Sequence, residues 1–161
     1  MTETRKTYVL LVSTAFPHNH ARPKEKTNFP ELILQEKKIH TIRANYKLWE
    51  HRFKQIEKDE AVLSIRHWES KPYKSSQVHI QTLTKADGIG LQSFEITPFG
   101  PLVDGNLILG LPPSRVAAND GLSPQDFSSW FHNSFLPGTP KALIHFTSFR
   151  YKQEELTDSE I

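Results

Sequence analysis

The chain has 161 residues, of which 20 are Lys or Arg and 18 are Asp or Glu, giving a formal net charge of +2. With 37% hydrophobic and 24% charged residues, its composition is typical of a folded domain and excludes an intrinsically disordered chain. The sequence contains no cysteine, which excludes disulfides, thiolate zinc sites, iron–sulfur clusters and a cysteine nucleophile.

The sequence predicts a single domain over 1–151, followed by an acidic and flexible tail at 152–161. Its N-terminal apolar run is only six residues long, and no window approaches the roughly 18 apolar residues of a membrane span. We therefore expect a cytoplasmic protein with no membrane contact. His18 and His20 lack a companion ligand pair at metal-binding spacing, so we predict neither a metal site nor a cofactor.

The first third of the chain predicts one strand, a long loop and a helix. Residues 7–13, TYVLLVS, form a continuous apolar run that is typical of a buried strand. The loop that follows, 14–28, has a length that is usually functional or mobile. A helix is predicted over 29–37, with Asn28 as its cap, and an extended segment, IHTIR at 39–43, comes next.

A second helix is predicted over 46–58, because apolar residues recur there at intervals of three and four. The residues of this stripe, expected in the core, are Tyr46, Trp49, Phe53 and Ile56. The remaining elements are predicted as strands at 61–70, 76–84 and 89–97, a hairpin at 101–109, a helix at 122–131 capped by Ser123, and a strand at 141–149. Consecutive strands argue against a doubly wound parallel sheet, so we expect a mostly antiparallel α+β fold.

Lys38, Thr41 and Arg43 lie within six positions and are candidates for chemistry. A threonine hydroxyl is a useful nucleophile only when a base takes its proton, and a lysine amine serves as that base only when its pKa is lowered. Burial, or a cation such as Arg43, would lower it. In the structural alternative, which spacing alone favours, Lys38 caps the first helix and Thr41 simply favours a strand.

Asn119, Asp120 and Gly121 form a second polar cluster, predicted just before a helix N-terminus. Backbone N–H groups collect polar or anionic partners at such a position, and Asp120 would orient a lysine or hold a water molecule. Asn-Asp-Gly is also favourable turn chemistry without any function, and the cluster taken alone favours the turn.

Basic and aromatic residues alternate in a third region, which begins with Arg66 and Trp68 and continues through Lys71, Tyr73 and Lys74. Bases stack on Trp and Tyr while Lys and Arg contact phosphate, so this region is a candidate surface for RNA. The alternative is that strand alternation places Trp68 in the core.

The segment EKKIHTIR resembles the K-x-x-T-I-R signature of ASCH (activating signal cointegrator homology) domains, which belong to the PUA-like β-barrel superfamily. The resemblance covers roughly residues 30–150, and only the signature is specific. It implies a curved antiparallel β-barrel with helices packed around it. The chain is also similar to small bacterial ASCH proteins that hydrolyse N4-acetylcytidine, which are near two-thirds of its length.

This resemblance implies a catalytic set of Lys38 as base, Thr41 as nucleophile and Asp120 as the later carboxylate, where those hydrolases have Glu. It further implies that Arg43 faces a nucleobase or nucleoside. With it, Asn119, Arg66 and Trp68 are our candidates for contact with a modified nucleoside or RNA. Two alternatives stay open. One is a non-enzymatic RNA-binding module that uses a basic and aromatic cleft, and the other is an ASCH scaffold for a small unrelated ligand.

Overall fold

The computed structural model describes residues 4–131 and 139–153. Within these residues the fold is α+β, as the sequence predicts, and it has eight strands in two sheets and four α-helices. In chain order the elements are β1 (Lys6–Leu11), α1 (Phe29–Leu34), β2 (His40–Arg43), α2 (Tyr46–Glu57), β3 (Ala61–Trp68), β4 (Gln77–Leu83), a 3-10 turn (Lys85–Asp87), β5 (Gly90–Thr97), β6 (Gly100–Val103), β7 (Asn106–Leu107), α3 (Pro113–Asn119), α4 (Pro124–Trp130) and β8 (Lys141–His145). Most of the predicted acidic tail lies outside the described residues.

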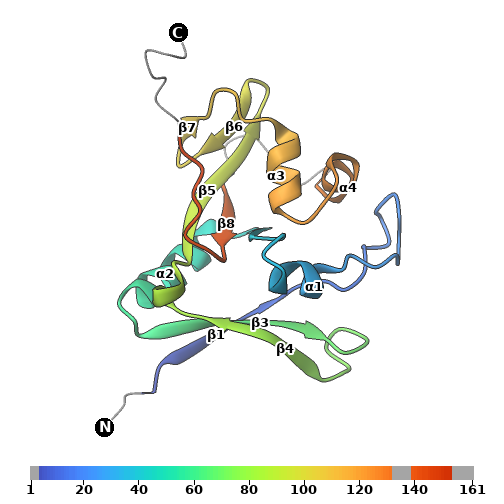
Figure 1. Cartoon of the computed structure of the whole chain (residues 1–161), viewed down its shortest axis with the longest axis vertical. Helices are drawn as coiled ribbons and strands as arrows, with labels where there is room; N and C mark the ends of the chain where they lie inside the picture. The colour runs from blue at the N-terminus through green and yellow to red at the C-terminus, as the bar shows by residue number, and fades with distance from the viewer. Residues whose placement is uncertain (1–3, 132–138, 154–161) are drawn as a thin grey trace.

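The first sheet has three strands in the order β1-β3-β4 and lies at the bottom of Figure 1. β3 and β4 are antiparallel, with a register shift between Ile65 and Arg66. β1 and β3 run parallel, from the pair Lys6–Ala61 to the pair Leu11–Arg66. The fold is mostly antiparallel, as expected, and β1 is the exception, because α1, β2 and α2 intervene and form the long crossover that a parallel pair needs.

The second sheet has five antiparallel strands in the order β2-β8-β5-β6-β7, and α3 and α4 lie beside its upper part (Figure 1). β8 lies between β2 and β5, and its residues Ala142, Leu143 and Ile144 are completely buried. The strands of the described residues thus form two sheets, and the closed PUA-like barrel stays a prediction.

Helix α2 packs its predicted apolar stripe in the core. Trp49, Phe53 and Ile56 are buried, and Tyr46 is partly buried against them. Asn45 begins the helix in the left-handed conformation, and its side-chain oxygen accepts a hydrogen bond from the backbone N–H of Leu48. The 3.6-residue periodicity of the sequence therefore identifies the buried face correctly.

The first helix begins at Phe29, as predicted, but it ends early and lacks the expected side-chain cap. Asn28 has a left-handed conformation and makes no side-chain cap, and α1 ends at Leu34 rather than at residue 37. Glu36 adopts a positive φ of 56°, and the next two N–H groups both donate to the carbonyl of Leu32. This early stop places Lys38 in an irregular link before β2 instead of on the helix.

Helix α3 was not predicted, because Asn119-Asp120-Gly121 indicated a turn. Pro113 occupies the first turn of α3, where proline is well tolerated, and Asp120 is its C-terminal cap. The turn predicted at Asn119-Asp120-Gly121 is present, but it forms the C-terminal end of α3, and Gly121 adopts a φ of 78° there. For α4 the predicted cap is correct, since Ser123 accepts a hydrogen bond from the N–H of Asp126.

Candidate active site

A cavity of about 220 Å³ lies between β2, the start of α1 and the end of α4. It is lined by Ser13, Phe29, Lys38, Thr41, Ile42, Arg43, Ala44, Asp120, Leu122, Trp130 and Phe131. The structure therefore brings Lys38, Thr41, Arg43 and Asp120, four of the residues singled out in the sequence, to one cavity. Asp120 comes from a point 82 positions after Lys38, so the chain's fold, and not the local motif, delivers the carboxylate.

Lys38 is buried, with 2% of its surface exposed, and its amine contacts Asp120 twice. Nζ donates to the main-chain oxygen of Asp120 at 2.7 Å and lies 3.1 Å from the carboxylate Oδ1. The amine also lies 4.2 Å from the ring centre of Phe29. The side chain therefore does not cap α1, which was the structural alternative for this residue.

Burial lowers the pKa of Lys38 below 10.5, and the positive charge of Arg43 lowers it further, while Asp120 acts in the opposite direction. A lysine with a lowered pKa holds more of its amine in the neutral form near pH 7. Only the neutral form has a lone pair that accepts a proton, so this environment makes Lys38 a better base.

Gly121 explains how the backbone of α3 comes so close to Lys38. A Cβ on this glycine would lie 3.1 Å from Cβ of Lys38 and 3.4 Å from a side-chain methyl of Leu32. The positive φ of Gly121 also disfavours any residue with a side chain. Asp120 and Gly121 thus end α3, and the missing side chain of Gly121 leaves room for the aliphatic part of Lys38.

Thr41 and Arg43 are two positions apart on β2, so their side chains leave the same face of the strand. Thr41 is 6% exposed and is paired with Ile144 of β8. Arg43 donates from Nη2 to the carbonyl of Leu11 at 2.7 Å, whereas its buried Nε has no hydrogen-bond partner within the described residues. Burial lowers the pKa of Arg43. This N–H is therefore a candidate donor to a ligand.

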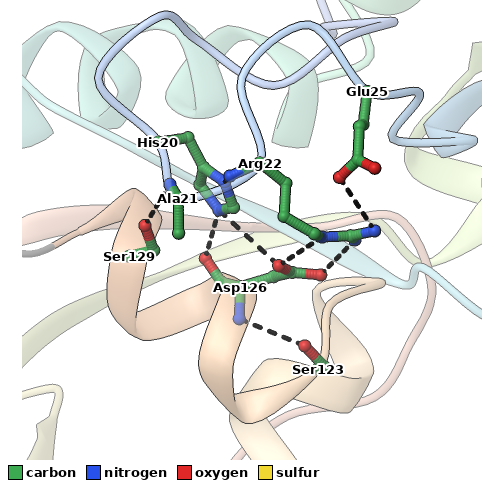
Figure 2. A network of polar contacts seen from close by, with 7 residues as sticks. All are labelled: His20, Ala21, Arg22, Glu25, Ser123, Asp126 and Ser129. Atoms are coloured by element: carbon green, nitrogen blue, oxygen red, sulfur yellow. Dashed lines mark hydrogen bonds and ion pairs between the residues drawn. The ribbon is translucent and has the colours of Figure 1, made fainter.

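The loop 14–28 and helix α4 are joined by a polar network next to the cavity (Figure 2). Arg22 binds the carboxylate of Asp126 with two N–H groups, and Nε2 of His20 lies 3.0 Å from the main-chain oxygen of Asp126. The hydroxyl of Ser129 accepts a hydrogen bond from the N–H of Ala21. These contacts attach the loop to the helix that carries the aromatic wall of the cavity.

Trp130, at the end of α4, is the centre of that wall. Its ring lies 5.6 Å from Phe16, 6.1 Å from His20 and 5.7 Å from Phe29, measured between ring centroids. Sequence reasoning did not identify these aromatic residues as neighbours of the site. The loop length indicated a function, but no local pattern indicated that the loop packs on α4.

The remaining predicted binding residues do not line the cavity. Arg66 donates to Ser64 and Gln77 within the three-stranded sheet, and Trp68 packs against Tyr73 with ring centroids 5.2 Å apart. Asn119 is likewise not a lining residue, and its amide nitrogen donates to the hydroxyl of Tyr151 at 2.9 Å.

His40 is a site neighbour that the sequence reasoning missed, although it stands inside the signature. Its Nδ1 lies 3.2 Å from Oδ1 of Asp120, and its Nε2 lies 2.7 Å from the hydroxyl of Tyr151. The ring is fully buried, and burial lowers its pKa, so it is neutral near pH 7.

Among the described residues, no group of three His, Asp or Glu side chains is arranged to hold a metal ion. None of the helices in that part of the chain combines the length and apolar character needed to span a bilayer. No family model matches the sequence, and comparisons with curated proteins and with solved structures also gave no match.

Proposed function

We propose that this chain is an ASCH-type, PUA-like domain that hydrolyses the acetyl amide of N4-acetylcytidine. The observation that carries the proposal is that Lys38, Thr41 and the distant Asp120 line one small cavity, with the buried lysine amine in contact with the Asp120 carboxylate. The resemblance of EKKIHTIR to the ASCH signature supplies the substrate class.

The size of the cavity favours a nucleobase over a longer nucleic-acid segment. At about 220 Å³ it is smaller than the roughly 300–1,000 Å³ of pockets that enclose drug-sized ligands. We therefore propose that the acetylated base enters it and that the sugar stays outside. The aromatic wall formed by Phe29 and Trp130 offers an apolar surface for the base.

In the first half of the proposed reaction, the neutral amine of Lys38 takes the hydroxyl proton of Thr41. The Thr41 oxygen forms a bond to the acetyl carbonyl carbon, and the carbonyl π electrons move to oxygen. The free Nε–H of Arg43 is the candidate donor for that oxyanion. When the intermediate collapses, the bond from carbon to N4 breaks, and Lys38 returns its proton to N4. The products are cytidine and an acetyl ester on Thr41.

In the second half, Lys38 takes a proton from a water molecule, and the resulting hydroxide adds to the ester carbon. The bond from that carbon to the Thr41 oxygen then breaks, and the oxygen takes the proton back from Lys38. Acetic acid leaves and ionises in solution. Asp120 keeps the amine directed throughout, because its main-chain oxygen and its carboxylate both accept from Nζ.

The test is the release of acetate and cytidine from N4-acetylcytidine by the purified full chain. Thr41→Val keeps the shape of the side chain and removes the hydroxyl, and Lys38→Met keeps its length and removes the amine. Each is expected to abolish turnover. Thr82→Val, a strand threonine whose hydroxyl contacts His79, is the matched control and is expected to keep full activity. Absence of turnover in the wild type would overturn the proposed reaction.

A second candidate function, a non-enzymatic RNA-binding module, is favoured by a different surface. Tyr73 is 87% exposed at the turn between β3 and β4, and it packs against Trp68 beside the exposed Lys71 and Lys74. This combination suits base stacking with nearby phosphate contacts. It predicts affinity for single-stranded RNA that falls steeply with salt and falls again in Tyr73→Ala. Turnover in the wild type together with no RNA affinity would reject it.

A further inference from the structure

A buried chain of hydrogen bonds leads away from the candidate active site into the core. Asp120 contacts His40 at 3.2 Å, His40 contacts the Tyr151 hydroxyl at 2.7 Å, and Asn119 contacts the same hydroxyl at 2.9 Å. His40, Asp120 and Tyr151 are all buried. In the described part of the chain, neither His40 nor Tyr151 lines the cavity that contains Thr41.

The direction of each bond follows from the chemistry of its acceptor. A carboxylate only accepts, so the hydrogen of the neutral His40 ring is on Nδ1 and points to Asp120. Nε2 then carries the lone pair and accepts from the Tyr151 hydroxyl. The phenol oxygen in turn accepts from the amide nitrogen of Asn119. Each donor in this series of hydrogen bonds therefore points toward the Asp120 carboxylate.

Oδ1 of Asp120 thus has two donors, Lys38 from the cavity side and His40 from the core side. We propose that His40 and Tyr151 are positioning residues, which hold the Asp120 carboxylate in the orientation that directs the Lys38 amine at the cavity. This inference rests on the proposed function for its activity readout, whereas its structural readout is independent of any reaction. His40 acts through Asp120 and does not touch the substrate.

The fold contains a matched control for His40. His145 is its register partner on β8, is equally buried, and its ring meets that of His40 edge to face at 5.6 Å. His145, however, hydrogen-bonds to Gln92 and not to Asp120. A substitution at His145 therefore disturbs the same region of the core without removing a donor from the carboxylate.

The experiment compares His40→Leu, His40→Asn, Tyr151→Phe and His145→Leu in the full chain. His40→Leu removes the donor, while His40→Asn offers an amide N–H near the position of Nδ1. We expect kcat for acetate release to fall about tenfold or more in His40→Leu, since small displacements of a catalytic group have effects up to about a hundredfold. Tyr151→Phe should show a smaller decrease, His40→Asn should recover much of the activity, and KM should change little. His145→Leu should keep the wild-type kcat even if its melting temperature falls as far as that of His40→Leu.

The second readout is the titration of the Lys38 amine, followed by NMR with isotope-labelled lysine. The charged or titratable groups that face it are Asp120 and Arg43, with the ring of His40 next to Asp120. Without the His40 donor, Oδ1 interacts with Lys38 alone, so the Lys38 pKa should rise in His40→Leu and not in His145→Leu. Histidine nitrogen shifts should show a hydrogen on Nδ1 of His40.

Equal effects of His40→Leu and His145→Leu on kcat and on Lys38 titration would overturn the proposal, as would a hydrogen on Nε2 of His40. If the wild type releases no acetate, the proposed reaction fails. The titration of Lys38 and the tautomer of His40 then still decide whether His40 positions Asp120.

Discussion

The amine of Lys38 lies 2.7 Å from the main-chain oxygen of Asp120 and 3.1 Å from the carboxylate of the same residue. The first of these contacts involves a peptide carbonyl, which keeps its acceptor character at every pH. The second involves a charge. Both contacts direct the amine, but only the charged carboxylate raises its pKa, so the effect of the charge can be separated from that of the main-chain contact.

This separation gives a prediction for Asp120→Asn. The variant keeps the main-chain contact and loses the negative charge, so the Lys38 pKa should fall further below that in the wild type. Activity should decrease less than in Lys38→Met, and the acid side of the pH–rate profile should move to lower pH. The pH dependence of kcat for acetate release provides the measurement, and a shift to higher pH would contradict it.

The core stripe of α2 predicts a large loss of stability for Phe53→Ala. Phe53 is 2% exposed, and removing a buried aromatic ring costs about 3–5 kcal/mol of unfolding free energy. Leu48→Ala on the same helix is the control, since Leu48 is 40% exposed and its substitution should cost no more than about 0.5 kcal/mol. Urea unfolding of both variants measures the difference.

Gly90→Ala should destabilise the chain because of Arg150. A Cβ on Gly90 would lie 2.7 Å from the guanidinium carbon, which is held by hydrogen bonds to the carbonyls of Thr147, Phe149 and Gly88. Displacing the guanidinium leaves these partners unsatisfied, with an expected cost of about 1–3 kcal/mol. In an Arg150→Ala background the same change should cost much less. Equal costs in both backgrounds, measured by thermal unfolding, would show that Arg150 is not the cause.

The contact between Arg22 and Asp126 predicts an acid-dependent loss of stability. The hydrogen bond from Arg22 lowers the pKa of Asp126, so the ionised carboxylate stabilises the folded state above its unfolded pKa of about 4. The contribution is lost as the pH falls through the lower, folded pKa. The difference in unfolding free energy between wild type and Asp126→Asn should therefore be largest above pH 5 and shrink toward pH 2.

Because Arg22 is about half exposed, this difference should be small, within about 1 kcal/mol, and should decrease with added salt. Glu25→Gln serves as control, since Glu25 contacts the same arginine but is itself exposed. A difference for Asp126→Asn that does not depend on pH would show that the carboxylate is not the stabilising group.

The candidate site was partly predictable, because three of its residues lie within one short motif. Spacing and residue type make Lys38, Thr41 and Arg43 candidates, and the resemblance to the ASCH signature indicates that Lys38, Thr41 and Asp120 belong together. The core face of α2 was identified from periodicity. His40 was overlooked because a histidine between an isoleucine and a threonine gives no sign of its partners. The network of Arg22 and Asp126 spans 104 positions, and nothing local relates the two residues.

The fold was predictable in class and in most of its elements, but not in its pairing. Alternation along β3 and β4 indicated strands, yet the parallel partner of β1 depends on a crossover whose path no local pattern describes. Helix α3 was missed because its seven residues begin within a proline pair and end within a favourable turn sequence. In each of these cases tertiary packing decided what the local sequence left open.

The pairing of β2 with β8 has a consequence for the order of events during synthesis. β2 ends at Arg43, but its hydrogen-bonded partner begins only at Lys141, so about a hundred residues must be made before Thr41 can face Ile144. Contacts at such separation form late and slowly, because the intervening chain must first be ordered. The parallel pair of β1 and β3 needs only the first 68 residues. On a ribosome the nascent chain would therefore carry the paired strands β1 and β3 while the cavity still lacks Asp120 and the wall residues that follow it, Leu122, Trp130 and Phe131.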